Sequence, residues 1–209
     1  MKLSRRLGMS DSNGYNYSTM ALISPAQIGV IRDAQTNVLA MRLLETEVCE
    51  YWSVIFSARG VATLTKQDIT GFLSYRQNHR WREISKEDVA ADMPRLRAAL
   101  GVLLNEGVDI AERLDSLEPG RGALAVLHLG KAKLTPILLV TNPRRYGVWN
   151  DYSERALRGM GLFPDFNPDQ HLGAQYLAVN QVLSGLAAEY RLSLWRLDII
   201  LEQLARLVR

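Results

Sequence analysis

One stretch in the second half of the chain combines residue types that could bind phosphate and act on a sugar. It opens with a glycine turn, 128–130, which Lys131 and Lys133 flank. Backbone N–H groups that are free where such a turn opens a helix suit an anion such as a DNA phosphate. Asp151, eighteen residues after Lys133, follows Asn150 at the head of a further helix. A carboxylate or amide there can stabilise positive charge that develops on a sugar and can orient a water molecule.

Three helices are expected to position these groups. A short helix closes on the turn 128–130, and a second helix starts within 132–135. The later start is favoured because Pro136 is tolerated only in a first helical turn. Asn142-Pro143 ends this second helix, since proline removes a donor and biases the preceding residue away from helix. A third helix is expected over 152–160, directly after the polar pair.

This arrangement resembles that of the helix-hairpin-helix DNA glycosylases, the endonuclease III-like superfamily. Their hairpin reads roughly Leu-Pro-Gly-Val-Gly-x-Lys, and a catalytic aspartate follows one apolar segment later. In this chain the segment 126–133 lies over the hairpin, with His128 in the place of the first glycine and Gly130 at the second. Either Asn150 or Asp151 takes the aspartate position, depending on the residue from which the spacing is counted.

The resemblance implies a DNA glycosylase, a hydrolase that binds double-stranded DNA and cleaves the N-glycosidic bond of a modified or damaged base. Base-excision DNA repair and antiviral defence against foreign DNA are the processes that fit such an enzyme. Asp151 or Asn150 would be catalytic, and neither a cofactor nor a metal is implied. The DNA-binding residues that the resemblance and the glycine turn indicate are His128, Gly130, Lys131 and Lys133.

The sequence leaves other readings of the same residues open. A lysine nucleophile would add strand cleavage through a Schiff base, but Lys131 and Lys133 lie beside a phosphate-binding turn, which favours a monofunctional enzyme. Asn150 in place of an aspartate instead favours a non-catalytic helix-hairpin-helix module, which could bind DNA beside a separate nuclease. In a third interpretation Asn150 and Asp151 only cap a helix of an interaction protein.

A second candidate region is the basic and aromatic cluster within 75–83. Arg80 and Arg82 suit phosphate contacts, and Trp81 could stack on a base or wedge beside one, with Asn78 close by. The alternative is a solvated loop from which Trp81 packs into the hydrophobic core, and the sequence favours neither interpretation.

Length and composition limit the class of protein. The 209 residues, 47% of them hydrophobic, suffice for one helical domain, with or without a division into two lobes. A net charge of +3 permits nucleic acid as a partner without requiring it. One cysteine and three scattered histidines predict no disulfide and no metal centre. Without a membrane-spanning run or a signal-peptide core, we expect a cytoplasmic protein, which we take to be a monomer.

The rest of the chain predicts an all-α helical bundle. Residues 1–24 lack any period and are expected to form a flexible arm, which could touch the DNA backbone. Residues 25–209 form the helical domain, with the hairpin around 123–142. Ser24-Pro25 is expected to open a long core helix that ends near Arg59-Gly60, and Trp52 is expected to pack inside. Further helix caps are expected at Thr65, Ser85, Asp92 and Ser193.

Overall fold

The computed structural model describes residues 29, 38–74, 86–167 and 169–207. Within these residues every regular element is an α-helix and no strand is present, so the prediction of an all-α fold is confirmed. The helices are α2 Val38–Ile55, α3 Ala58–Thr63, α4 Lys66–Ser74, α5 Lys86–Val89, α6 Met93–Leu103, α7 Ile110–Asp115, α8 Lys131–Thr141, α9 Asp151–Gly159, α10 Leu172–Glu189 and α11 Leu194–Leu207.

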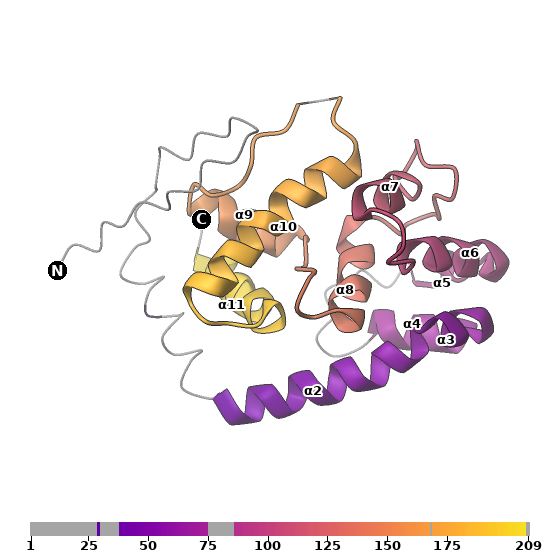
Figure 1. Cartoon of the computed structure of the whole chain (residues 1–209), viewed down its shortest axis with the longest axis horizontal. Coiled ribbons are helices and arrows are strands. Elements are labelled where there is room, and N and C mark those ends of the chain that lie inside the picture. Colours follow the sequence, from indigo (N-terminus) through magenta and orange to yellow (C-terminus); the bar gives the residue numbers. More distant parts are fainter. Residues whose placement is uncertain (1–28, 30–37, 75–85, 168, 208–209) are drawn as a thin grey trace.

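Helix α8 lies in the middle of the molecule (Figure 1). It has α9, α10 and α11 on one side and α3 to α7 on the other, and α2 runs along the edge of both groups. Every residue from 133 to 140 is buried, so α8 is covered on all its faces. Helix α2 packs on α8, α9 packs on α11, and α7 packs on α10. The start of α8 therefore belongs to a helix that the rest of the fold holds in place.

The start of α8 corrects two expectations from the sequence. The helix begins at Lys131, before the predicted range 132–135, so Pro136 lies inside the helix. The apolar residues after it are fully buried, and this burial outweighs the helix hydrogen bond that a proline cannot donate. The short helix expected directly before the turn is absent, because α7 ends at Asp115 and residues 116–130 form turns and irregular backbone.

The end of the first long helix also differs from the prediction. Helix α2 ends at Ile55, and Gly60 lies inside α3 instead of stopping α2. Ser57 caps α3 by accepting a hydrogen bond from the Gly60 N–H. A Cβ at Gly60 would lie 2.3 Å from the Ile55 carbonyl oxygen, so glycine is needed for the sharp change of direction. The predicted start of this helix at Ser24-Pro25 lies outside the described residues.

Other details predicted from the sequence are confirmed. Thr65 and Asp68 form a capping box, in which each side chain accepts the other residue's backbone N–H. Asp92 accepts from Arg95 N at the start of α6, and Ser193 caps the first turn of α11. Trp52 is buried and meets Phe72 edge to face, with ring centroids 5.0 Å apart. No described helix combines the length and the apolar character needed to cross a membrane.

Cys49, the single cysteine of the chain, is buried on α2. Burial, and then the negative charge of Glu45, raise the pKa of its thiol to about 11.

Candidate functional site at the starts of α8 and α9

The first turn of α8 has no side-chain cap. Gly130 is the N-cap residue and has extended backbone angles, φ −93° and ψ −172°. Within the described residues no acceptor takes the backbone N–H groups of Lys131 and Ala132. Both residues are partly exposed, so these two N–H groups at the positive end of the helix are the candidate donors for a ligand.

The turn in front of α8 is held from inside the protein. His128 has φ 61°, in the left-handed region that glycine adopts at little cost, whereas Leu129 beside it is buried. The Lys133 ammonium donates to the His128 carbonyl oxygen at 2.7 Å. On the outside, His128 Nε2 lies 3.4 Å from Asp88 Oδ2. The backbone of the turn is thus fixed by a lysine that follows it.

Lys131 and Lys133 differ in their surroundings, although the sequence assigned both to phosphate contact. Lys133 is only 8% exposed, and burial lowers the pKa of its ammonium, while the negative charge of Asp88 acts in the opposite direction. Its described role is to hold the turn. Lys131 has 32% of its side chain exposed, so it is the better placed of the two to meet a phosphate, although its ammonium is already paired with Glu154.

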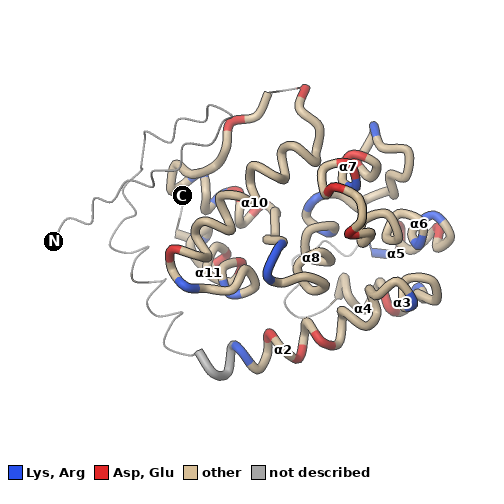
Figure 2. The backbone as a smooth tube through the Cα atoms, in the orientation of Figure 1, with Lys and Arg blue, Asp and Glu red and all other residues tan. Residues whose placement is uncertain are grey.

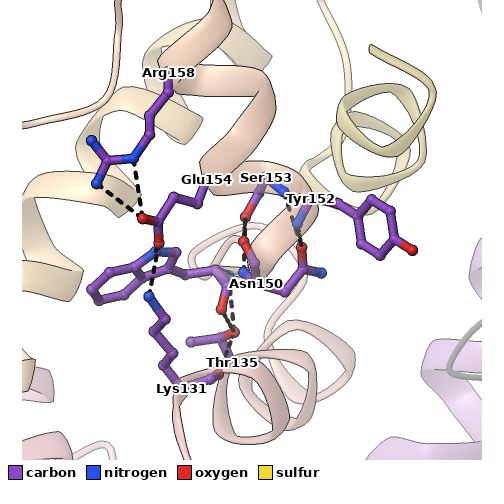
Figure 3. Close-up of polar contacts among 8 residues, drawn as sticks. Lys131, Thr135, Asn150, Tyr152, Ser153, Glu154 and Arg158 are labelled. Atoms are coloured by element: carbon purple, nitrogen blue, oxygen red, sulfur yellow. Dashed lines mark hydrogen bonds and ion pairs between the residues drawn. The ribbon is translucent and has the colours of Figure 1, made fainter. Parts of the chain in front are cut away.

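The start of α9, in contrast, is capped by side chains (Figure 3). The Asn150 amide oxygen accepts from the backbone N–H groups of Tyr152 and Ser153, at 2.9 and 3.0 Å. The Ser153 hydroxyl in turn accepts from the Asn150 N–H at 2.9 Å, which completes a capping box. The interpretation of Asn150 as an N-cap is therefore confirmed, and its amide oxygen is already engaged.

Asp151 is the first residue of α9 and is exposed. Within the described residues no hydrogen bond or ion pair engages its carboxylate. A negative charge in the first turn of a helix is stabilised by the backbone dipole, so this position suits an ionised carboxylate that faces solvent.

A carboxylate on α9 connects the two helix starts (Figure 3). Glu154 Oε2 accepts from Lys131 Nζ at 2.8 Å and from Trp149 Nε1 at 3.2 Å, and Glu154 Oε1 accepts from Arg158. Lys131 Nζ also lies 3.9 Å from the centroid of the buried Trp149 ring, in a cation–π contact. Burial alone would raise the pKa of Glu154, but the hydrogen bonds from Lys131 and Arg158 outweigh it and the pKa is lowered.

Thr135 makes a second connection between the same helices. It is buried on α8, its hydroxyl donates to the Lys131 carbonyl oxygen at 2.9 Å, and it accepts from the Trp149 backbone N–H at 2.9 Å. The chain that leads into α9 is thus fixed to the first turn of α8. The two halves of the site that the sequence proposed are brought together by residues that it did not single out.

The sequence carried a weak signal for Glu154 and almost none for Thr135. Glu154 stands in the first turn of an amphipathic helix, where acidic residues are common, so nothing marked it as a partner of Lys131. Thr135 stands beside Pro136, and this pair is typical of a helix start, so nothing in the sequence marked Thr135 as a partner of Trp149. The basic and aromatic cluster with Asn78, Arg80, Trp81 and Arg82 lies outside the described residues.

A buried polar network lies farther along the chain. Arg113 is fully buried and donates to the Leu103 carbonyl oxygen, to Glu106 Oε1 and to the Tyr146 hydroxyl. Tyr146 in turn donates to Glu106, which also pairs with Arg145. Burial raises the pKa of Glu106, but the bonds from Tyr146 and Arg113 outweigh it, so the pKa is lowered. The network joins the end of α6, α7 and the segment after α8.

The charged residues of the described helices do not form a surface of one sign. Basic and acidic positions are interspersed over the described helices (Figure 2). A hollow of about 440 Å³ lies on α11, lined by Ile199, Glu202, Gln203, Arg206 and Leu207.

The fold and these contacts define an all-helical protein in which two helix starts are joined by a shared carboxylate. Comparison with protein-family models, with curated proteins and with solved structures finds no match for this chain. The function therefore has to be argued from the site itself.

Proposed function

We propose that the protein binds double-stranded DNA at the uncapped start of α8 and excises a modified or damaged base with Asp151 as the stabilising carboxylate. One observation carries the proposal. The exposed carboxylate of Asp151 stands at the start of α9, which Lys131 and Glu154 join to the open N–H groups of α8.

The backbone supports phosphate binding at the first turn of α8. The N–H groups of Lys131 and Ala132 and the dipole of an eleven-residue helix attract an anion. The preceding turn lies where the glycosylases that the sequence resembles have their hairpin turn, although residues 116–130 form no helix in front of it. His128 in this turn has φ 61°, a conformation that glycine adopts at little cost. Binding through phosphates releases counterions, so the affinity falls steeply as salt rises.

The start of α9 offers side chains that suit the base-excision reaction. As the base leaves, positive charge develops on the sugar, and an ionised Asp151 can offset it. The Asn150 amide oxygen is engaged by the backbone, whereas its NH₂ group has no partner among the described residues and can bond to the sugar or to a water molecule. In this proposal Asp151 supplies the negative charge, and Asn150 orients the sugar or the water molecule.

An excision assay tests the proposal. The protein is incubated with duplexes that contain diverse modified bases, and alkali then reveals abasic sites by strand cleavage. We expect Asp151→Asn to lower the excision rate by about a hundredfold or more. DNA affinity, measured by fluorescence anisotropy, should not weaken, because a lost negative charge does not reduce phosphate binding.

Asp169→Asn is the matched control, because it removes the same charge from another exposed aspartate. It should leave excision unchanged. Excision that survives Asp151→Asn, or that falls equally in both variants, would place the chemistry elsewhere.

A second function is favoured by one specific contact. Because the Asn150 oxygen is used in capping, the residue at one of the two possible catalytic positions has a structural role. A non-catalytic DNA-binding module accounts for this arrangement equally well. Salt-dependent DNA binding that Lys131→Gln weakens, together with no excision of any base, would establish that alternative.

A further inference from the structure

Three potential metal ligands meet at the junction of α7 and α10. Asp115 ends α7, Glu118 lies in the turn that follows, and His171 is the N-cap residue of α10. One ligand atom from each side chain lies within 4.8 Å of the others. Within the described part of the chain this is the one place where three such groups converge.

The packing of the two helices fixes this meeting point. A Cβ at Gly173 would lie 2.2 Å from the Ala111 carbonyl oxygen, so α7 and α10 approach as closely as a glycine allows. The Gly173 N–H also donates to Asp115 Oδ1 at 2.7 Å. This bond orients the Asp115 carboxylate and leaves Oδ2 without a partner among the described residues, in the way that outer contacts orient metal ligands.

The other two groups face each other across the junction. His171 Nδ1 lies 2.8 Å from Glu118 Oε2, and the Glu118 side chain is only 14% exposed, compared with 59% for His171. Arg121 Nη1 lies 3.6 Å from Glu118 Oε1, with nearly half of its side chain in solvent. The Arg121 guanidinium therefore already balances part of the negative charge of Glu118, but its exposed side chain can rotate away from the carboxylate.

We propose that Asp115, Glu118 and His171 bind one divalent transition-metal ion, with zinc as the ion of best fit. Ligand bonds of about 2.0–2.2 Å in a tetrahedral site place ligand atoms about 3.3 Å apart. The 2.8 Å separation of His171 Nδ1 and Glu118 Oε2 is shorter than this value, so these two side chains would move slightly apart to receive an ion.

The mixture of ligands selects the class of ion. An imidazole nitrogen with two carboxylate oxygens suits zinc and its neighbours, whereas magnesium and calcium prefer oxygen ligands alone. Three protein ligands leave a fourth position for water, and the exposure of His171 opens that position to solvent.

The sequence argued against a metal centre because its histidines are scattered. The ligands of this site come from two segments separated by 53 residues, between Glu118 and His171, and only the packing of α7 on α10 joins them. The ion would tie these two helices together.

Calorimetric titration of the full chain with zinc chloride tests the proposal. We expect one saturable site, which Asp115→Asn, Glu118→Gln and His171→Asn each weaken about tenfold or more. Asp115→Asn keeps an oxygen for the Gly173 N–H, so the variant separates loss of charge from loss of packing. Glu112→Gln, which removes a charge one turn earlier on α7, is the control and should bind zinc like the unaltered chain.

A thermal melt gives a second measurement. Zinc should raise the unfolding temperature of the unaltered chain and of the control, because a ligand that binds only the folded state stabilises it. Magnesium should not. The proposal is overturned if no saturable zinc binding is found, or if the three ligand variants bind zinc as tightly as the control.

Discussion

The starts of α8 and α9 lie next to each other and are built in opposite ways. At α8 a glycine precedes the helix and two backbone N–H groups have no acceptor among the described residues. At α9 the Asn150 side chain accepts two backbone N–H groups and the Ser153 hydroxyl accepts the Asn150 N–H, which forms a capping box. Lys131 and Glu154 join the two, so one surface combines an open positive helix end with a closed one that carries Asp151.

The capped start of α9 is suited to stabilising the fold, whereas the uncapped start of α8 is suited to binding. A capped helix start contributes to folding and offers a ligand little, whereas an uncapped start forgoes that contribution and keeps its donors for an anion. Changes at α9 should therefore mainly lower stability, and changes at α8 should mainly alter DNA affinity.

Asn150→Ala should give the largest loss of stability. It removes the acceptor of two backbone N–H groups and should lower the free energy of unfolding by about 1–2 kcal/mol, measured by urea denaturation. The corresponding change at α8, Gly130→Ala, removes no side-chain bond, and the new Cβ would lie 3.7 Å from Pro119. It should alter the free energy of unfolding by less than about 0.5 kcal/mol. Equal losses of unfolding free energy in Asn150→Ala and Gly130→Ala would contradict the proposed difference between the two helix starts.

Glu154→Gln should have a smaller effect, and one that depends on pH. The folded-state pKa of Glu154 lies below its ordinary value of 4.5, so the ionised carboxylate stabilises the fold above that value. As the pH falls through the folded-state pKa, this stabilisation disappears. The variant should be about 1 kcal/mol less stable at neutral pH and equal to the unaltered chain in acid. A difference that persists after the carboxylate has been protonated would mean that packing, not charge, joins the helices.

Gly130→Ser should have the smallest effect on stability and a clear effect on binding. The extended backbone of Gly130 is that of an ordinary N-cap, so a serine hydroxyl could accept one of the open N–H groups. We expect a gain of a few tenths of a kcal/mol in stability. DNA affinity should fall roughly tenfold, the equivalent of about 1.4 kcal/mol, because the hydroxyl competes with the phosphate. Unchanged affinity would show that phosphate does not bind these N–H groups.

Local signals in the sequence predicted the helices better than their boundaries. The caps at Thr65, Asp92 and Ser193 depend on neighbouring residues alone and were predicted correctly. The position of Pro136 inside α8 was not predicted, because its tolerance depends on burial by helices that are distant in sequence. Gly60 likewise reads as a helix stop, although it is required for close packing at a bend.

The candidate site was predicted in part for the same reason. The polar pair is a contiguous motif, so the sequence placed Asn150 at a helix start correctly, whereas α8 begins directly after Gly130, earlier than predicted. The partners that join these starts, Thr135 and Glu154, are defined only by the approach of α8 to α9. The burial of Lys133 was hidden for a further reason, since a lysine next to a turn normally faces solvent.

The buried Cys49 allows the opening of α2 to be measured by thiol labelling. Thiolate is the form that reacts with alkylating reagents, and a pKa of about 11 leaves on the order of one thiol in ten thousand ionised at neutral pH. Labelling therefore requires α2 to separate from the core, and its rate measures how often this helix opens. Because the chain has a single cysteine, the motion of one named helix can be timed without introducing any probe.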